Sequence, residues 1–177
     1  MLRELRIENI AVIERAELTF QPGLSVLSGE TGAGKSIIID ALNAILGGRV
    51  SRELIRTGQS RAVVTAVFTG LSRATRDTAR DLGLEVGEEL ILRREMEADG
   101  RNLCRVCGQP ATLAMLRALG QGLVSIYGQH DGQHLLNEQL HIDYLDAFGG
   151  TEAAIAAYEV EYERLAAINR RIRALSL

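Results

Sequence analysis

The sequence predicts an α/β fold organised around a phosphate-binding loop, and three features of its N-terminal region support this. Apolar and charged residues alternate at the start, a short apolar segment leads into a glycine-rich loop, and apolar residues then recur at helical spacing. Alternation is typical of strands buried on one face, whereas recurrence every three to four residues indicates an amphipathic helix. Strand and helix patterns alternate through most of the remaining chain, which favours a mixed fold.

Two half-buried antiparallel strands are expected at the N-terminus. Leu5 and Ile7 alternate with charged residues in the first strand, and Ala16 and Leu18 do the same in the second. A Gln-Pro-Gly turn then precedes a short apolar strand at 24–27. This last strand runs directly into the glycine-rich loop, so it would position that loop.

A helix is expected to begin at Lys35. Ile38, Leu42 and Ile45 fall on one of its faces, and the pair Gly47-Gly48 is typical of a helix end. Glycine can adopt the left-handed conformation with which many helices end. An apolar strand, a glycine-rich loop and a helix therefore follow one another without interruption.

The chain from there to residue 150 alternates between strand and helix patterns. Strands are expected at 61–68, 90–96, 102–106 and 123–127, and helices at 72–82, 112–119 and 138–148. An Ala-Asp-Gly turn at 98–100 joins two of these strands into a hairpin. Gly-Gln-Pro at 108–110 predicts a break in the chain, and the apolar strand at 123–127 is expected to be buried.

Residues 1–150 are interpreted as one globular part, and residues 151–177 as the start of a coiled-coil arm. Thr151 suits a helix N-cap, and no glycine or proline follows it. The a and d positions of a heptad are occupied by Ile155, Tyr158, Tyr162, Leu165, Asn169 and Ile172. The alternative is an ordinary amphipathic helix that packs on the globular part.

The composition excludes several classes of protein. With 46% hydrophobic and 24% charged residues, the chain is expected to fold rather than to be disordered. Its net charge of −3 provides no overall positive field, so any contact with nucleic acid must be local. No apolar run is long enough to span a membrane, the N-terminus has no signal-peptide pattern, and cysteines are few. We therefore expect a cytoplasmic protein without a membrane partner.

Residues 29–36 match the phosphate-binding pattern G-x-x-x-x-G-K-[ST], known as Walker A. The residues expected to bind the nucleotide are Gly29, Glu30, Thr31, Gly32, Ala33, Gly34, Lys35 and Ser36. Backbone N–H groups of such a loop converge on phosphate oxygens at a helix N-terminus. Lys35 is expected to reach the β- and γ-phosphates of ATP, and the Ser36 hydroxyl to ligate Mg²⁺.

Lys35 is the only lysine among the 20 lysine and arginine residues of the chain. An arginine fork is wide, planar and rigid, whereas this position needs a compact ammonium group on a flexible stem. The single exception in an otherwise all-arginine set therefore supports the assignment of Lys35 to the phosphate site.

Two parts of a complete ATPase of this kind are not found in the sequence. Hydrolysis needs a Walker B carboxylate directly after an apolar strand, and Asp131 lies too far beyond the strand at 123–127. A Leu-Ser-Gly-Gly-type signature is also missing. An ABC-type transporter ATPase would carry both parts in one compact chain, and a P-loop metabolite kinase would leave the heptads unexplained. Both stay open as alternatives on these grounds alone.

Three segments beside the Walker A motif give the chain a family resemblance. They are Leu-Arg-Ile-Glu-Asn-Ile at 5–10, Tyr-Gly-Gln-His-Asp-Gly-Gln-His-Leu-Leu at 127–136, and Leu-Asp-Ala-Phe at 145–148. Together with the motif they resemble the RecN family, which are bacterial DNA-repair ATPases of the SMC-like, ABC-type class. The resemblance extends over nearly the whole chain.

The resemblance implies that this chain is the N-terminal half of a P-loop ATPase head of the ABC/SMC type. In that family the head forms from the two ends of a long polypeptide joined by a coiled coil, and its C-terminal half carries Walker B and the signature. ATP then joins two heads as a homodimer in recombinational repair of DNA double-strand breaks. The chain alone is expected to be inactive, and the whole protein to be associated with the bacterial nucleoid.

The resemblance also assigns the expected catalytic residues, Lys35 and Gln129. Gln129 matches the glutamine of the family's Q-loop, which contacts Mg²⁺ or the attacking water, and Gln133 is the weaker candidate. Without the resemblance, either glutamine would be interpreted as a solvated loop residue.

A cluster of arginines follows the Walker A helix. Arg49, Arg52 and Arg56 would share one face if this segment were helical, and they are candidate contacts to DNA. The alternative is a solvated face with no ligand.

Cys104, Cys107, His130 and His134 imitate the ligands of a zinc site. The cysteines lie within or at the end of an expected strand, where a C-x-x-C turn does not readily form, and the histidines lie far along the chain. Small buried or half-buried thiols are therefore expected, with no metal.

Overall fold

The computed structural model describes residues 1–28, 34–126 and 141–175. The chain packs as two compact units, Met1–Ile126 and Tyr127–Leu177. This division concerns packing alone, and the functional boundary expected between residues 150 and 151 stays a prediction.

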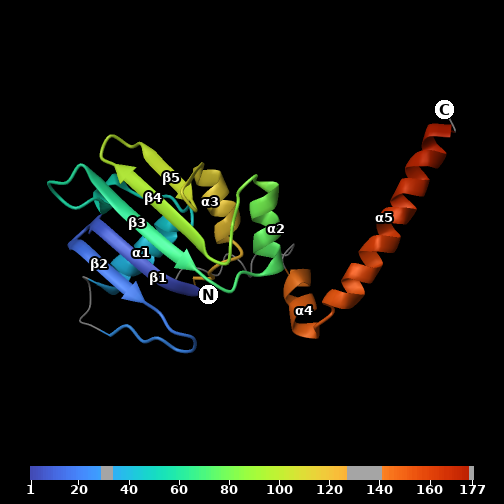
Figure 1. The fold of residues 1–177 in the computed structure, drawn as a ribbon, viewed down its shortest axis with the longest axis horizontal. Helices are drawn as coiled ribbons and strands as arrows, with labels where there is room; N and C mark the ends of the chain where they lie inside the picture. Colours follow the sequence, from blue (N-terminus) through green and yellow to red (C-terminus); the bar gives the residue numbers. More distant parts are fainter. Residues whose placement is uncertain (29–33, 127–140, 176–177) are drawn as a thin grey trace. The chain divides into compact units, whose positions relative to one another are not determined.

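The first unit is built on a six-stranded antiparallel sheet (Figure 1). Its strands are β1 (Leu2–Ile10), β2 (Ile13–Thr19), β3 (Arg61–Phe68), β4 (Leu90–Glu97), β5 (Asn102–Val106) and β6 (Gln109–Ala111). Their order across the sheet is β2-β1-β3-β4-β5-β6. Its helical elements are α1 (Lys35–Ile45), the short 3₁₀ helix η1 (Arg52–Leu54), α2 (Arg73–Asp81) and α3 (Leu113–Gly120).

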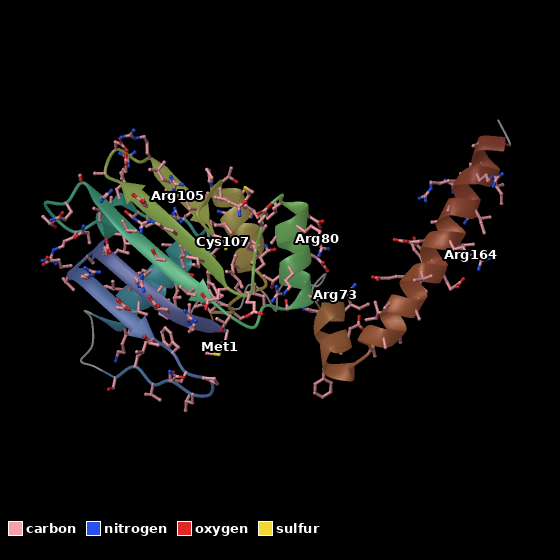
Figure 2. The ribbon with its side chains drawn as sticks, viewed as in Figure 1. Met1, Arg73, Arg80, Arg105, Cys107 and Arg164 are labelled. Atoms are coloured by element: carbon pink, nitrogen blue, oxygen red, sulfur yellow. The ribbon has the colours of Figure 1, made fainter. Side chains whose placement is uncertain are left out.

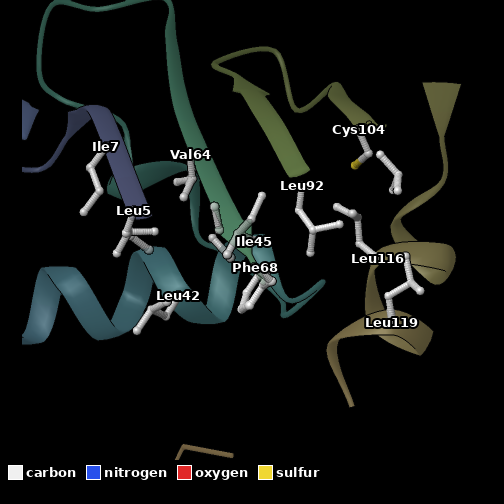
Figure 3. Close-up of a cluster of buried hydrophobic side chains, with 14 of the residues drawn as sticks. Leu5, Ile7, Leu42, Ile45, Val64, Phe68, Leu92, Cys104, Leu116 and Leu119 are labelled. Carbon is white, nitrogen blue, oxygen red and sulfur yellow. The ribbon is translucent and has the colours of Figure 1, made fainter. Parts of the chain in front are cut away.

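The core of this unit lies between the sheet and α1. Leu5 opposes Ala66 and Ile7 opposes Val64 in the β1–β3 register, and all four side chains are fully buried. Figure 3 shows strand side chains meeting Ile45 of α1. The other large, fully buried side chains in this cluster include Phe68, Leu92, Leu116 and Leu119. Burying one such side chain contributes about 1.5–3 kcal/mol, so the core fixes α1 firmly against the sheet.

Most of the expected elements are confirmed, and side-chain caps explain where two of the helices begin. The hydroxyl of Ser72 accepts a hydrogen bond from the Thr75 N–H at 3.1 Å and starts α2. The hydroxyl of Thr112 accepts one from the Met115 N–H at 3.2 Å and starts α3. Each bond satisfies a backbone donor that the first turn of a helix would otherwise leave unpaired. The β4–β5 hairpin also forms as expected, with Gly100 at a positive φ of 96°.

The predictions of strands at 24–27 and 123–127 are wrong for the residues that the structure describes. Residues 24–28 and 123–126 are in no strand, and Leu24 and Val26 expose 92% and 75% of their surface. An apolar run becomes a strand only when a neighbouring strand satisfies its backbone N–H and C=O groups. Neither segment has such a neighbour among the strands that the structure describes.

A short strand forms where only a break was expected. Residues Gln109–Ala111 form β6, which pairs with β5 at the edge of the sheet. Pro110 lacks a backbone donor, but an edge strand needs hydrogen bonds on one side only. Cys107 and Gly108 form the turn before it, with positive φ angles of 47° and 81°.

The second unit contains the helices α4 (His141–Gly149) and α5 (Glu152–Leu175). The Thr151 hydroxyl, just before α5, donates to the Asp146 carboxylate at 3.0 Å. The rings of Tyr158 and Tyr162 stack with centroids 5.9 Å apart on α5. Exposed apolar heptad side chains on this helix are Tyr158, Tyr162, Leu165 and Ile172. That this stripe belongs to a coiled-coil arm stays a prediction.

Among the residues that the structure describes, no helix is both long enough and apolar enough to cross a membrane.

Candidate nucleotide-binding site

The N-terminus of α1 carries the described part of the Walker A motif. Gly34 is the N-cap, and Lys35 and Ser36 are the first two residues of the helix; all three are exposed. No atom of the described residues lies within 4 Å of the position that a Cβ on Gly34 would take, so this part of the chain leaves the backbone there open to a ligand. The first turn of α1 has no acidic residue, and its N–H groups therefore favour an anion.

Much of the expected site falls outside the described residues. Gly29, Glu30, Thr31, Gly32 and Ala33 of the loop belong to this group, as do Gln129, Asp131 and Gln133. The structure therefore places Gly34, Lys35 and Ser36, while the roles of the loop and of Gln129 stay predictions.

The buried face of α1 fixes the direction in which its N-terminus points. Ile37, Ala41, Leu42, Ala44 and Ile45 are buried on that face. The helix contacts β1, β3 and β4, three adjacent interior strands of the sheet. Because five side chains along three turns are anchored, α1 presents Lys35 and Ser36 on a rigid support.

Two arginines that the sequence analysis missed bind the C-terminal end of α1. Arg94 on β4 donates from Nη1 to the carbonyl oxygens of Ala44 and Gly48, at 2.6 and 2.8 Å. Arg117 on α3 donates from Nη2 to the Gly47 carbonyl oxygen at 3.0 Å. The Ala44 carbonyl is in the last turn of α1, where it also accepts from the Gly47 N–H at 3.1 Å, and Gly47 and Gly48 follow the C-cap residue Leu46. The two guanidinium groups therefore bind the last turn of α1 and the two glycines just after it. The last turn of α1 itself contains no basic residue.

Arg94 is buried, with only 2% of its surface exposed. Its Nε donates to the Asn102 side-chain oxygen at 2.9 Å, which completes its set of acceptors. Burial lowers the pKa of Arg94, nearby Cys104 opposes this, and nearby Arg117 adds to it. The pattern of β4 could have revealed this residue, since Leu90, Leu92, Arg94 and Met96 occupy alternate positions that are all buried.

The three candidate DNA contacts, Arg49, Arg52 and Arg56, do not lie on one helical face, because most of this segment is not helical. Only Arg52–Leu54 is helical in this segment, as the short element η1. Arg49 instead lines an open pocket of about 540 Å³ together with Asp40 and Glu53. The backbone is extended at Ser51 and Ile55, on either side of η1, and the Ser51 hydroxyl caps the start of η1 by accepting from the Glu53 N–H at 3.3 Å.

The side chains of Arg52 and Arg56 lie against two different turns of the sheet. A terminal nitrogen of Arg52 lies 2.6 Å from the position that a Cβ on Gly100 would take, in the β4–β5 turn. Arg56 is half-buried and donates to the Val12 carbonyl oxygen at 2.6 Å, in the turn between β1 and β2. Arg56 therefore holds that turn in place, and Arg49 and Arg52 are the more accessible of the three cations.

The two cysteines are free thiols, as expected. Cys104 is buried and Cys107 is half-buried at the end of β5 (Figure 2). Burial raises the pKa of the Cys104 thiol, with nearby Arg94 opposing the rise. Within the described residues, no three metal-ligating side chains gather into a site. His130 and His134 lie outside those residues.

Several exposed arginines are paired with acidic side chains of the same helix. Arg73 and Arg80 on α2 (Figure 2) lie 3.7 and 2.9 Å from the Asp77 carboxylate. Arg164 on α5 lies 3.9 Å from Glu161. These pairs partly neutralise the charge of Arg73, Arg80 and Arg164.

Comparison with known families places the site in context. The model of a family described as "AAA domain" matches residues 4–98, which include the Walker A motif and the strands β1 to β4. The match covers more than half of the chain.

The chain is also similar to a curated bacterial protein. It is 41% identical over 180 residues to the DNA repair protein RecN of Bacillus subtilis (strain 168), covering 99% of this chain and 31% of the relative. The chain therefore spans about a third of the length of that protein.

Solved structures share the fold. A chain from work described as "Structural biochemistry of ATP-driven dimerization and DNA stimulated activation of SMC ATPases" has a TM-score of 0.61 at 22% identity, over 80% of this chain and 97% of that one. The Smc head domain of Pyrococcus furiosus, with an extended coiled coil, has a TM-score of 0.60 at 22% identity, over 97% and 49%. The expected P-loop ATPase fold of the SMC-head type is thereby confirmed.

Proposed function

Because the chain belongs to the family of AAA domains, we propose that it is the N-terminal, ATP-binding half of an ATPase head in a RecN-like DNA repair protein. The observation that carries this proposal is the start of α1, where Gly34, Lys35 and Ser36 stand exposed on a helix anchored in the core. The similarity to RecN over 99% of the chain supports recombinational repair of DNA breaks as the process.

The residues at the start of α1 fit ATP with Mg²⁺. The open backbone at Gly34 admits a phosphate, and the first turn of α1 holds no carboxylate that would repel one. Lys35 would neutralise the β- and γ-phosphates, and the exposed Ser36 hydroxyl would ligate the metal ion. Mg²⁺ when bound supplies charge neutralisation on the phosphate oxygens. We assign Gln129 the positioning of the attacking water.

The two apolar segments that lack strand partners support the need for a second half. Residues 24–28 lead into the Walker A loop, and residues 123–126 lead towards Gln129. Both would become strands if the C-terminal half of the head supplied neighbouring strands. That half would also bring Walker B and the signature, so the chain alone would hydrolyse ATP negligibly.

The remaining partners follow from the same proposal. Two completed heads would engage through ATP as a homodimer, and hydrolysis would release them. The solved SMC chain with this fold comes from work on ATP-driven dimerization and DNA-stimulated activation, which supports both partners. Arg49 and Arg52, with Arg56 behind them, would contribute the local positive charge that DNA contact requires. Neither a transporter subunit nor a metabolite kinase is favoured, because the similar curated protein is a DNA repair protein.

Nucleotide binding tests the core of this proposal. Titration of the 177-residue chain with a fluorescent ATP analogue and Mg²⁺ should give saturable binding, and Lys35→Ala should weaken it by at least about tenfold. The matched control is Arg93→Ala, on the sheet face away from the motif. Equal affinity of the wild-type and Lys35→Ala chains for the ATP analogue would refute the assignment of Lys35 to a phosphate site.

DNA contact is tested separately, with the completed head. Arg49→Glu combined with Arg52→Glu should weaken binding of a DNA duplex and flatten its dependence on salt. Arg73→Glu combined with Arg80→Glu, on α2, reverses as many charges and should leave the affinity unchanged. Unchanged DNA affinity in the first variant would make the arginine cluster a solvated face.

A further inference from the structure

The end of α1 opposite the phosphate site is held by groups from two other elements. Arg94 comes from β4 and Arg117 from α3. Arg94 binds the carbonyls of Ala44 and Gly48, and Arg117 binds the carbonyl of Gly47. Neither arginine is near Lys35 in the sequence, and neither belongs to the Walker A motif. The core alone would already attach α1 to the sheet, so these bonds need a separate explanation.

Burying Arg94 has a high desolvation cost. A guanidinium removed from water destabilises the fold unless its donors are satisfied. Arg94 donates to three oxygen acceptors, the carbonyls of Ala44 and Gly48 and the side chain of Asn102. An apolar residue at this alternate position of β4 would pack without that cost. The fold therefore accepts the desolvation cost of a buried charge at Arg94, and the result is that the end of α1 is fixed to β4.

A close backbone approach reinforces the same joint. A Cβ on Gly47 would stand 2.7 Å from the Arg117 backbone nitrogen, and one on Gly120 would stand 2.8 Å from the Leu46 carbonyl oxygen. Both gaps are too short for a side chain, so the end of α1 and helix α3 meet backbone to backbone. Such contact leaves little freedom for α1 to slide or tilt.

We propose that Arg94 and Arg117 are positioning residues for the phosphate site, acting through the length of α1. This inference rests on the proposed function. An 11-residue helix is about 16 Å long, and tilting it by about 4° about its held end displaces its N-terminus by about 1 Å. A misplacement of that size at a ligand-binding group is costly. Fixing the far end of α1 keeps Lys35 and the first N–H groups aligned with the phosphates.

Arg117 provides the cleaner variant, because its side chain is exposed and its loss leaves the core intact. Arg117→Ala should raise the Kd for a fluorescent ATP analogue about three- to tenfold, since the aligned position of α1 becomes a smaller part of the population. Arg93→Ala, at a half-buried arginine next to Arg94 on β4 that pairs with Glu95, is the control and should leave the Kd unchanged.

Chemical rescue separates positioning from general loss of stability. Ethylguanidinium at millimolar concentration should restore nucleotide affinity to Arg117→Ala by binding the Gly47 carbonyl, and should restore nothing to Lys35→Ala. Arg94→Lys, which keeps the charge with fewer donors, should fall between wild type and Arg94→Met. Thermal melts of every variant report the folded fraction.

The outcomes distinguish this inference from the proposed function. If Lys35→Ala keeps wild-type affinity, the proposed function fails and the inference fails with it. If Lys35→Ala loses affinity while folded Arg117→Ala and Arg94→Lys keep the wild-type Kd, only the positioning role is overturned. Loss of affinity in Arg117→Ala that ethylguanidinium does not restore also overturns it.

Discussion

The antiparallel sheet of the first unit and the two segments at 24–28 and 123–126 make an instructive pair. Both are apolar enough to predict strands, yet only the sheet forms them. Leu5 in β1 is fully buried, whereas Leu24 is 92% exposed. The difference is the presence of a neighbour, because β1 lies between β2 and β3 in the same chain. An apolar pattern indicates a capacity for pairing, and the pairing itself depends on a partner strand.

The proposed phosphate site lies on the boundary between these regions. Helix α1 is anchored on the six-stranded sheet, while residues 24–28, which enter the Walker A loop, pair with no described strand. One side of the phosphate site is therefore prepared by this chain, and the other side depends on the proposed C-terminal half.

The largest effect is expected from the core of the sheet. Leu92→Ala removes a fully buried side chain and should lower the free energy of unfolding by about 2–5 kcal/mol. Val26→Ala, in an exposed segment, should change it by less than about 0.5 kcal/mol. Urea titration of both variants measures the difference. Similar losses in the two would show that residues 24–28 are already packed.

Hydrogen exchange should show the next largest contrast. Amides at 24–28 should exchange rapidly in the chain alone, and those of β3 slowly. The reason is that β3 is hydrogen-bonded to a strand on each side, whereas residues 24–28 pair with no described strand. Addition of the C-terminal half should slow exchange at 24–28 by about a hundredfold or more, since strand pairing then protects them. Continued fast exchange in an assembled head would refute the proposed strand at this position.

The sequence predicted elements with local causes and missed those with distant ones. Ser72 and Thr112 begin their helices through bonds to residues three positions ahead, so local pattern was sufficient. The strand at 24–27 failed because pairing is not a local property. Arg94 was missed because its partners, Ala44 and Gly48, lie far along the chain.

The site followed the same rule. The Walker A pattern identified the start of α1 directly, since the chemistry of phosphate binding resides in contiguous residues. The arginines at 49, 52 and 56 would share a face only if their segment were helical, and its actual geometry depends on distant contacts, such as that of Arg56 with the Val12 carbonyl. Periodicity alone had no access to those contacts.

The smallest effect concerns the pH dependence of stability and arises in the core of the six-stranded sheet. Burial raises the pKa of Cys104 above its ordinary value, so the folded chain retains this proton more firmly than the unfolded chain. The resulting stability is complete below the ordinary thiol pKa of about 8.5 and is lost as the pH rises through the raised value. Urea midpoints at about pH 7.5 and pH 9.5 should fall more in wild type than in Cys104→Ala. Parallel changes would exclude Cys104 as the cause.

ATP turnover tests the central claim most directly. The purified chain should release negligible phosphate from ATP with Mg²⁺, and addition of the C-terminal half of the head should produce steady turnover that Lys35→Ala abolishes. The chain would then be shown to hold one part of a divided site. Substantial turnover by the 177-residue chain alone would contradict the account, because it would place a complete hydrolytic site within this sequence.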